Sequence, residues 1–306
     1  MDVGLLMLGG GVVAGIFGSL LGLGGGVLIV PLLTIGFGLP VRDAVGVSLI
    51  CVIMTSGASA SVYLERQVAN LRLGMLLELF TATGAVIGGA IAFLLDPRIL
   101  EGLFAVLLVY TAWTMLSAAR RRPVPAPADV PDGADPVADS TNVVDGSGSA
   151  PVAEAGAVAA TAVEAVSGDH GPFVARLAGP GYGIRRLRPA AVLSVFAGIA
   201  SALLGIGGGL IKVPVMHLVM GIPLRVATAT SNLMIGITGS TSAIVYLLRG
   251  GINPFATAPT AVGVFLGASV GSRLAHRIDV RVLRLLFVLV LLYTAFEMAR
   301  KAMGAA

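Results

Sequence analysis

The chain contains a run without charged residues that extends from Val3 to Val41, and this run limits the possible folds more than any other feature. Similar uncharged runs cover residues 44–64, 189–211, 226–248 and 250–272. A helix of roughly 20 apolar residues is long enough to cross a bilayer. Overall, 56% of the residues are hydrophobic and 12% are charged, which is about half the charged share of a soluble domain. Because backbone polar groups in lipid must pair within their own segment, the runs predict an all-α polytopic membrane protein.

The two halves of the chain match each other at a constant offset of 183 residues. The stretch "LLGLGGGVLIVP" begins at Leu20, and "LLGIGGGLIKVP" begins at Leu203. Other identical pairs at this offset are Gly15 and Gly198, Pro40 and Pro223, Ser48 and Ser231, Tyr63 and Tyr246, Asn70 and Asn253, Gly84 and Gly267, and Gly88 and Gly271. A register that holds over about a hundred residues indicates an internal duplication, which is a common construction among secondary transporters.

Each half predicts four membrane spans, so the chain is expected to contain about eight transmembrane helices. The spans are expected near residues 3–35, 41–64, 73–95 and 99–119, and near residues 189–218, 224–248, 255–276 and 282–301. The first span of each half is longer than one crossing needs, and glycines break it. Four crossings per half would make the repeats parallel, whereas an extra crossing in the first span would make them inverted. Both arrangements stay open.

We assign residues 1–119 to a first transmembrane repeat, residues 120–188 to a linker and residues 189–306 to a second transmembrane repeat. The linker is rich in Pro, Ala, Gly and Asp, and it holds eight acidic residues and one basic residue between positions 123 and 184. Such a segment cannot bury enough apolar surface to offset the entropy of ordering. We therefore predict a disordered tether and assign it no role.

The basic residues predict an orientation, because loops on the cytoplasmic side carry an excess of Lys and Arg. Those near 66–72, 120–122, 185–188 and 300–301 share one side of an eight-span arrangement. They place both termini and the linker in the cytoplasm, in a multi-pass protein of the cell membrane, although the basic cluster at 273–284 opposes this. The same positive charge would also favour anionic substrates.

Two glycine clusters form the first candidate site, each followed by a proline, Pro31 or Pro214. Glycine inside a helix costs about 1 kcal/mol relative to alanine, and proline removes a hydrogen-bond donor. The clusters predict breaks in two membrane helices, whose free N–H groups can bind an anion near the membrane midplane. Helix packing is the alternative, and we prefer it for the pairs Gly84/Gly88 and Gly267/Gly271. The candidate glycines are Gly22, Gly24, Gly25, Gly26, Gly205, Gly207, Gly208 and Gly209.

A second candidate element begins after Pro40 in the first half and after Pro223 in the second. Hydroxyl and amide side chains stand there at the start of a membrane helix, where they could contact an anion held by the glycine breaks. Hydrogen bonding of these hydroxyls to their own helix backbone is the alternative. The candidate side chains are Ser48, Thr230, Ser231 and Asn232.

Two ionisable residues lie inside apolar runs, where such residues are costly and mark functional sites. Lys212 replaces Ile29 of the first repeat, and it is expected to add positive charge to the anion site or to reach a membrane interface. Glu78 matches Ala261, and it is a candidate for proton coupling or a residue near the headgroups. The sequence has no phosphate-binding, zinc-protease or nucleophile-elbow motif, so we expect no enzyme, cofactor, metal site or nucleic-acid partner.

The duplicated G-x-G-G-G-x-x-x-x-P motifs, each followed by a small-polar helix that begins with proline, resemble those of the TauE/SafE family of sulfite exporters. This family is also called the toluene sulfonate uptake permease family. The resemblance covers roughly residues 3–119 and 189–301. It implies a secondary transporter for small sulfur-containing anions, such as sulfite, sulfonates or related organosulfur acids.

These observations together predict a transporter whose two repeats rock about a central anion site by alternating access. Its partners would be the sulfur-containing anion and the lipid bilayer, and a homo-oligomer is left open. A non-transporting membrane scaffold, or the permease subunit of a larger complex, is the alternative interpretation. A cation permease would need acidic, Cys or His side chains in the spans, where Glu78 is the good candidate.

Overall fold

The computed structural model describes residues 3–21, 25–65, 69–120, 184, 186–274 and 280–304. These residues form helices and the turns between them, and none of the described residues belongs to a β-strand. Six of the helices in this part of the chain are long and apolar enough to cross a membrane. The all-α polytopic fold expected from the uncharged runs is therefore confirmed.

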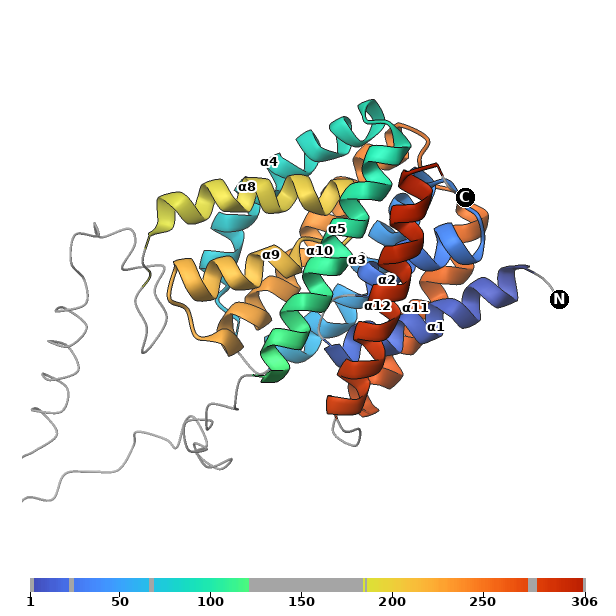
Figure 1. The fold of residues 1–306 in the computed structure, drawn as a ribbon. Helices are drawn as coiled ribbons and strands as arrows, with labels where there is room; N and C mark the ends of the chain where they lie inside the picture. The colour runs from blue at the N-terminus through green and yellow to red at the C-terminus, as the bar shows by residue number, and fades with distance from the viewer. Residues whose placement is uncertain are drawn as a thin grey trace, which may run out of the picture.

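The helices of the two halves follow the same order (Figure 1). The first half contains α1 (Val3–Leu21), α2 (Gly26–Pro31), η1 (Leu32–Gly36), α3 (Val41–Glu65), α4 (Leu71–Leu94) and α5 (Pro97–Arg120). The second half contains α8 (Leu187–Leu204), α9 (Gly209–Pro214), η2 (Val215–Val219), α10 (Leu224–Leu248), α11 (Pro254–Leu274) and α12 (Val280–Ala302). Apart from the short helices, these elements match the eight predicted spans.

The first predicted span of each half is a long helix followed by a short one. The short apolar helices cover Gly26–Gly36 and Gly209–Val219. At 1.5 Å per residue, 11 residues extend over roughly 16 Å, about half of the hydrocarbon core. Each short helix widens into a π-helix directly after its proline, Pro31 or Pro214. A missing proline N–H favours such a local change in hydrogen bonding. The expectation of broken first helices is confirmed.

Each first helix packs against a helix of the other half. α1 lies along α11, and the equivalent helix α8 lies along α4 (Figure 1). α3 packs on α10 and α5 packs on α12, so equivalent helices also pair with each other. The contacts of one half thus have counterparts in the other, and the two halves interlock rather than forming separate bundles.

Glycines allow these helices to approach each other closely. A Cβ atom at Gly84 would lie 2.1 Å from Val195 O, and one at Gly267 would lie 2.1 Å from Val12 O. A Cβ atom at Gly88 would lie 2.5 Å from Ile199 O, and one at Gly271 would lie 2.9 Å from Ile16 O. The packing interpretation of these two glycine pairs is therefore confirmed.

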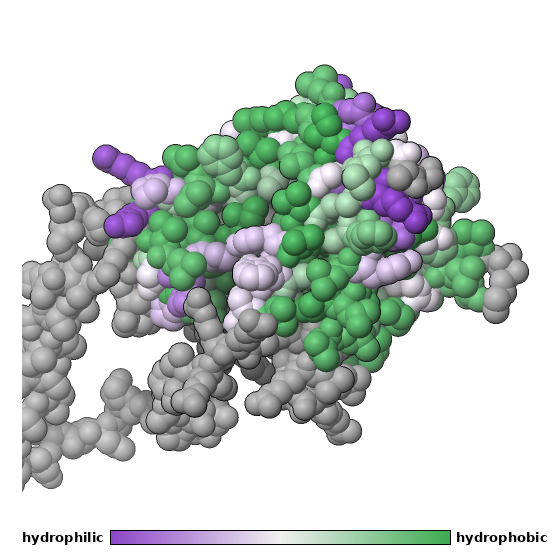
Figure 2. Space-filling model, viewed as in Figure 1, coloured by the Kyte–Doolittle hydropathy of each residue, from purple (hydrophilic) through white to green (hydrophobic). Residues whose placement is uncertain are grey.

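Large apolar side chains cover the outer surface. Phe255 is 90% exposed, Leu94 81% and Trp113 70%. Figure 2 shows hydrophobic residues over most of the coloured face, with hydrophilic residues gathered at separate places on its edge. A soluble monomer rarely exposes so much contiguous apolar surface, whereas a lipid-facing surface requires it.

Several expectations lie outside the described residues or stay predictions. Gly22 and Gly24 are not among the described residues, nor is most of the linker predicted at 120–188. The boundaries of the two repeats and the disorder of the linker stay predictions.

We expect Gly15→Ala to lower the thermal unfolding midpoint of the detergent-purified protein. A Cβ atom at Gly15 in α1 would lie 2.3 Å from Val264 O in α11, and overpacking of this kind costs about 1–3 kcal/mol. Gly9→Ala in the same helix is the matched control, since nothing lies within 4 Å of its Cβ position. An equal midpoint for the two variants would contradict the close α1–α11 packing.

Candidate functional site

The helix break of the second half is built from glycines in the left-handed backbone region. α8 ends at Leu204, and Gly205, Gly207 and Gly208 have φ angles of 67°, 72° and 76° before α9 begins. In the first half, Gly25 has a φ angle of 72° and precedes α2. Residues with a Cβ atom rarely adopt these angles, so the glycines explain why the chain can break here.

The two breaks meet on one face of α3. A Cβ atom at Gly26 would lie 2.6 Å from the carbonyl oxygen of Gly205. The Ser48 hydroxyl of α3 lies 2.7 Å from Gly205 O, to which it donates a hydrogen bond, and 3.3 Å from Gly26 O. One serine thus holds the end of α8 beside the start of α2, across the two halves.

The repeat-related serine of α10 has a different environment. Ser231 is fully buried, and its Oγ has no hydrogen-bond partner among the described residues. It lies 3.7 Å from the position that a Cβ atom would take on Gly209. The Oγ of Ser201 in α8 is likewise buried without a partner in the described part of the chain. Two hydroxyls beside the second break are therefore free to bind a ligand.

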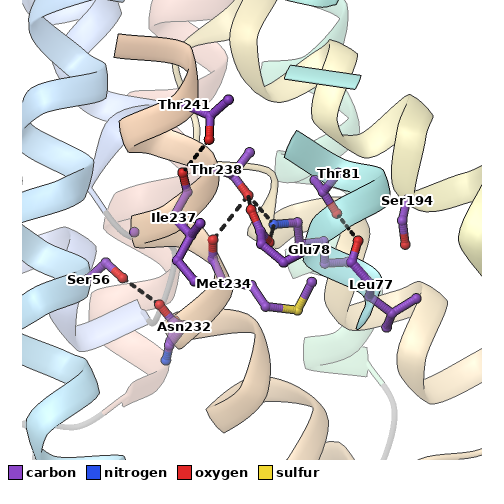
Figure 3. Close-up of polar contacts among 12 residues, drawn as sticks. Ser56, Leu77, Glu78, Thr81, Ser194, Asn232, Met234, Ile237, Thr238 and Thr241 are labelled. Atoms are coloured by element: carbon purple, nitrogen blue, oxygen red, sulfur yellow. Dashed lines mark hydrogen bonds and ion pairs between the residues drawn. The ribbon is translucent and has the colours of Figure 1, made fainter. Parts of the chain in front are cut away.

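Lys212, Glu78 and Thr238 form a buried charged cluster beside the second break. The Lys212 Nζ lies 3.0 Å from Glu78 Oε2, and the two side chains are 1% and 5% exposed. Thr238 donates a hydrogen bond to Glu78 Oε1, at 2.5 Å, and accepts one from Lys212 (Figure 3). Three elements carry this cluster: Glu78 is on α4, Lys212 is on α9 and Thr238 is on α10. α8 packs against α4 beside it.

The remaining candidates on α10 lie near the start of α4 and near α3. The Thr230 hydroxyl accepts a hydrogen bond from the Asn70 N–H at 3.0 Å, at the beginning of α4. Ser56 of α3 donates a hydrogen bond to the main-chain oxygen of Asn232 (Figure 3). These contacts hold α10 against both neighbours, and they use the backbone of Asn232 rather than its amide.

The sequence did not reveal that Lys212 and Glu78 are partners. The sequence predicts Lys212 as an anion ligand and Glu78 as a proton carrier, and these two predictions are independent of each other. The sequence does contain a signal for their pairing, because neither residue is matched by an ionisable residue in the other repeat. The equivalent of Lys212 is Ile29, and the equivalent of Glu78 is Ala261. Two unmatched ionisable residues of opposite charge in one membrane protein are expected to pair. Ser201, whose equivalent is Gly18, was not singled out at all.

The arrangement is suited to a small polar solute. It combines a buried ammonium group, two free hydroxyls and glycines that let a ligand approach the backbone. Among the described residues, no group of three or more His, Cys, Asp or Glu could hold a metal ion. Broken helices and buried polar groups inside a lipid-facing helical bundle are typical of membrane transporters.

The comparisons with known proteins define the family. Residues 7–298 match the family described as "Sulfite exporter TauE/SafE". The chain therefore belongs to the TauE/SafE family of membrane transporters. It is 24% identical over 291 residues to the "Probable membrane transporter protein YunE" of Bacillus subtilis (strain 168), covering 92% of this chain and 93% of that protein.

A shorter match links the chain to a plant protein. It is 34% identical over 87 residues to the "Sulfite exporter TauE/SafE family protein 6" of Arabidopsis thaliana, covering 28% of this chain and 20% of that protein. No solved structure matches the chain.

We expect Glu78→Ala to destabilise the fold by about 3–5 kcal/mol, because it leaves the Lys212 charge buried without a partner. The double variant Glu78→Ala/Lys212→Ile carries at each position the residue found at the equivalent position of the other repeat, and it should regain most of this loss. The free energy of unfolding in detergent, measured for both single variants and the double variant, tests the coupling. Glu297→Ala is the control, since it breaks the more exposed pair with Arg300 and should cost at most about 1 kcal/mol. Additive losses in the double variant would contradict the coupling.

Proposed function

We propose that this protein is a secondary transporter that carries a small sulfur-containing anion across the membrane by alternating access. The site lies where the two helix breaks meet, beside Lys212. The single observation that carries the proposal is this meeting of Gly26 and Gly205, from opposite halves, inside a family fold of membrane transporters.

The residues around the breaks have the chemistry that an oxyanion requires. Lys212 supplies a positive charge, and the hydroxyls of Ser201 and Ser231 supply hydrogen-bond donors. The glycines Gly25, Gly205, Gly207, Gly208 and Gly209 leave their main chain accessible at close range. Thr230 and Asn232 flank Ser231 on the same helix, α10, and we keep them as candidate anion contacts.

The unequal bonding of Ser48 and Ser231 supports alternating access. Ser48 donates to Gly205 O and so closes the contact between the breaks on its side. Its repeat equivalent Ser231 makes no such bond within the described part of the chain. Different bonding at two repeat-related serines is what a transporter with two related halves is expected to have in an end state.

Family relatives support the substrate class. The plant relative carries the words "sulfite exporter" in its name, and we extend them to this chain as a proposal. Sulfite and sulfonates present three oxygen atoms around one sulfur, which suits several donors converging from different helices. We place the protein in the cell membrane, with both termini and the linker in the cytoplasm.

Transport by the purified protein in liposomes tests the proposal. The panel comprises sulfite, thiosulfate, methanesulfonate, sulfoacetate, taurine and sulfate, each measured as uptake into vesicles without any added protein or ATP. We expect saturable uptake of at least one sulfite or sulfonate compound. Absence of uptake across the panel would favour the alternative, a membrane scaffold or the permease subunit of a larger complex.

We expect Gly208→Ala to lower the uptake of the best panel anion at least tenfold. Gly208 has a φ angle of 76°, and a Cβ atom there would lie 3.3 Å from Ser201 Cβ and 3.4 Å from Lys212 Cε. Gly38→Ala is the matched control, because Gly38 has a φ angle of 66° with nothing within 4 Å of its Cβ position. Both variants strain the backbone similarly, so equal uptake by the two would argue against a site at the second break.

A further inference from the structure

We propose that Lys212 and Glu78 couple the anion to a proton: the anion replaces Glu78 on Lys212 once Glu78 has accepted a proton. The inference rests on the proposed anion transport, and it adds the driving ion and the stoichiometry. Glu78 lies beside Lys212, at the position that the anion would take.

The charges of the cluster balance within it. Lys212 from α9 is the charged group that faces Glu78 among the described residues, and α10 contributes the uncharged Thr238. α8, which packs along α4, contributes the hydroxyls of Ser194 and Ser201 on the same stretch of helix and no charged group facing the pair. Lys212 in turn has Glu78 as its charged partner. The pair is therefore neutral as a unit.

An anion cannot join this neutral unit without a second charge. A single negative charge added beside an ionised pair would leave one charge uncompensated inside the membrane, at a cost of several kcal/mol. A proton that passes from water to a Glu78 carboxylate oxygen removes that excess. Lys212 stays protonated throughout. It exchanges the hydrogen bond that it donates to Glu78 Oε2 for one that it donates to an oxygen of the anion. Release of the anion and of the proton on the other side restores the original pair.

The two hydroxyls without a partner, near the second break, support a ligand site beside Lys212. Most helical hydroxyls here bond back to the carbonyl four residues earlier, as Ser194 does to Ala190 and Ser242 to Thr238. Ser201 and Ser231 make no such bond and are fully buried. A buried donor without a partner costs about 1–3 kcal/mol, so a ligand that accepts from both hydroxyls would remove this penalty.

The Lys212–Glu78 pair occurs once, although the framework is repeated, and this sets the stoichiometry. The repeat equivalents of Lys212, Glu78 and Ser201 are Ile29, Ala261 and Gly18, none of which is ionisable. A single proton-accepting carboxylate therefore serves the two-fold framework. The inference predicts one proton for each singly charged anion, and hence electroneutral transport.

Uptake of methanesulfonate into liposomes tests the coupling, because its one negative charge does not titrate near neutral pH. Sulfite is the second probe. For the wild-type protein, an interior one pH unit more alkaline than the outside should accumulate methanesulfonate about tenfold, the limit for one proton per anion. A potassium diffusion potential set with valinomycin, without a pH gradient, should cause no accumulation.

Glu78→Gln separates coupling from binding, because its neutral carboxamide imitates the protonated carboxyl group. We expect the anion–anion exchange rate of this variant to lose the pH dependence that the wild type shows. Accumulation under the pH gradient should be abolished. Glu297→Gln, in the more exposed pair with Arg300, is the control and should accumulate methanesulfonate like the wild type.

The outcomes distinguish the coupling from the transport function itself. Accumulation driven by the membrane potential and indifferent to the pH gradient would overturn the coupling and leave anion transport intact. Continued pH-driven accumulation in Glu78→Gln would do the same. Absence of any uptake or exchange of both probes by wild-type protein would overturn the proposed function, and the coupling with it. The wild-type measurements decide the question even where the variant does not fold.

Discussion

The requirement that every main-chain polar group inside a bilayer find a partner within the protein governs this structure. The two interrupted helices are compatible with it because protein groups cover their ends. The Ser48 hydroxyl donates a hydrogen bond to the Gly205 carbonyl, and the N–H groups of Ile211 and Lys212 donate hydrogen bonds to Gly208 O. Such contacts require closely packed helices. The glycines that break two helices and the glycines at which other helices pack therefore both serve to keep main-chain polar groups paired inside the protein. The charged cluster is possible for the same reason, since the packed helices exclude lipid from it.

Much of the fold follows from local sequence properties. Uncharged runs located the membrane helices, and the repeat offset located equivalent elements in both halves, because length and hydropathy decide whether a helix can lie in lipid. The breaks at Gly25 and Gly205 were predictable from glycine's backbone freedom alone. The pairing of α1 with α11 and of α8 with α4 was not, because it depends on which glycine faces meet in three dimensions. The π-helical turns after Pro31 and Pro214 were also not predictable from the sequence, since proline can end, bend or widen a helix.

The candidate site was only partly accessible from the sequence. Glycines and small polar residues were recognisable by their repetition, whereas the contact between Glu78 and Lys212 joins residues far apart in the chain on different helices. Their shared departure from the repeat is the signal that carries this information. Ser201 could not have been found, because nothing in a sequence distinguishes a helical serine that bonds to its own backbone from one that does not. A buried helical serine without a hydrogen-bond partner can be recognised only when the positions of the neighbouring helices are known.

The interlocked packing has a consequence for how the protein is made. α1 leaves the ribosome long before its partner α11, which begins at Pro254. Until then, the narrow glycine face of α1 has only lipid or transient neighbours to contact. The position of α8 in the chain differs from that of α1, because its partner α4 is synthesised before it. Assembly can therefore begin around α4 and α8, whereas the interfaces made by α11 and α12 form later. Truncation before residue 254 would leave a chain without α11 and α12, so that α1 and α5 would both lack the helices they pack against.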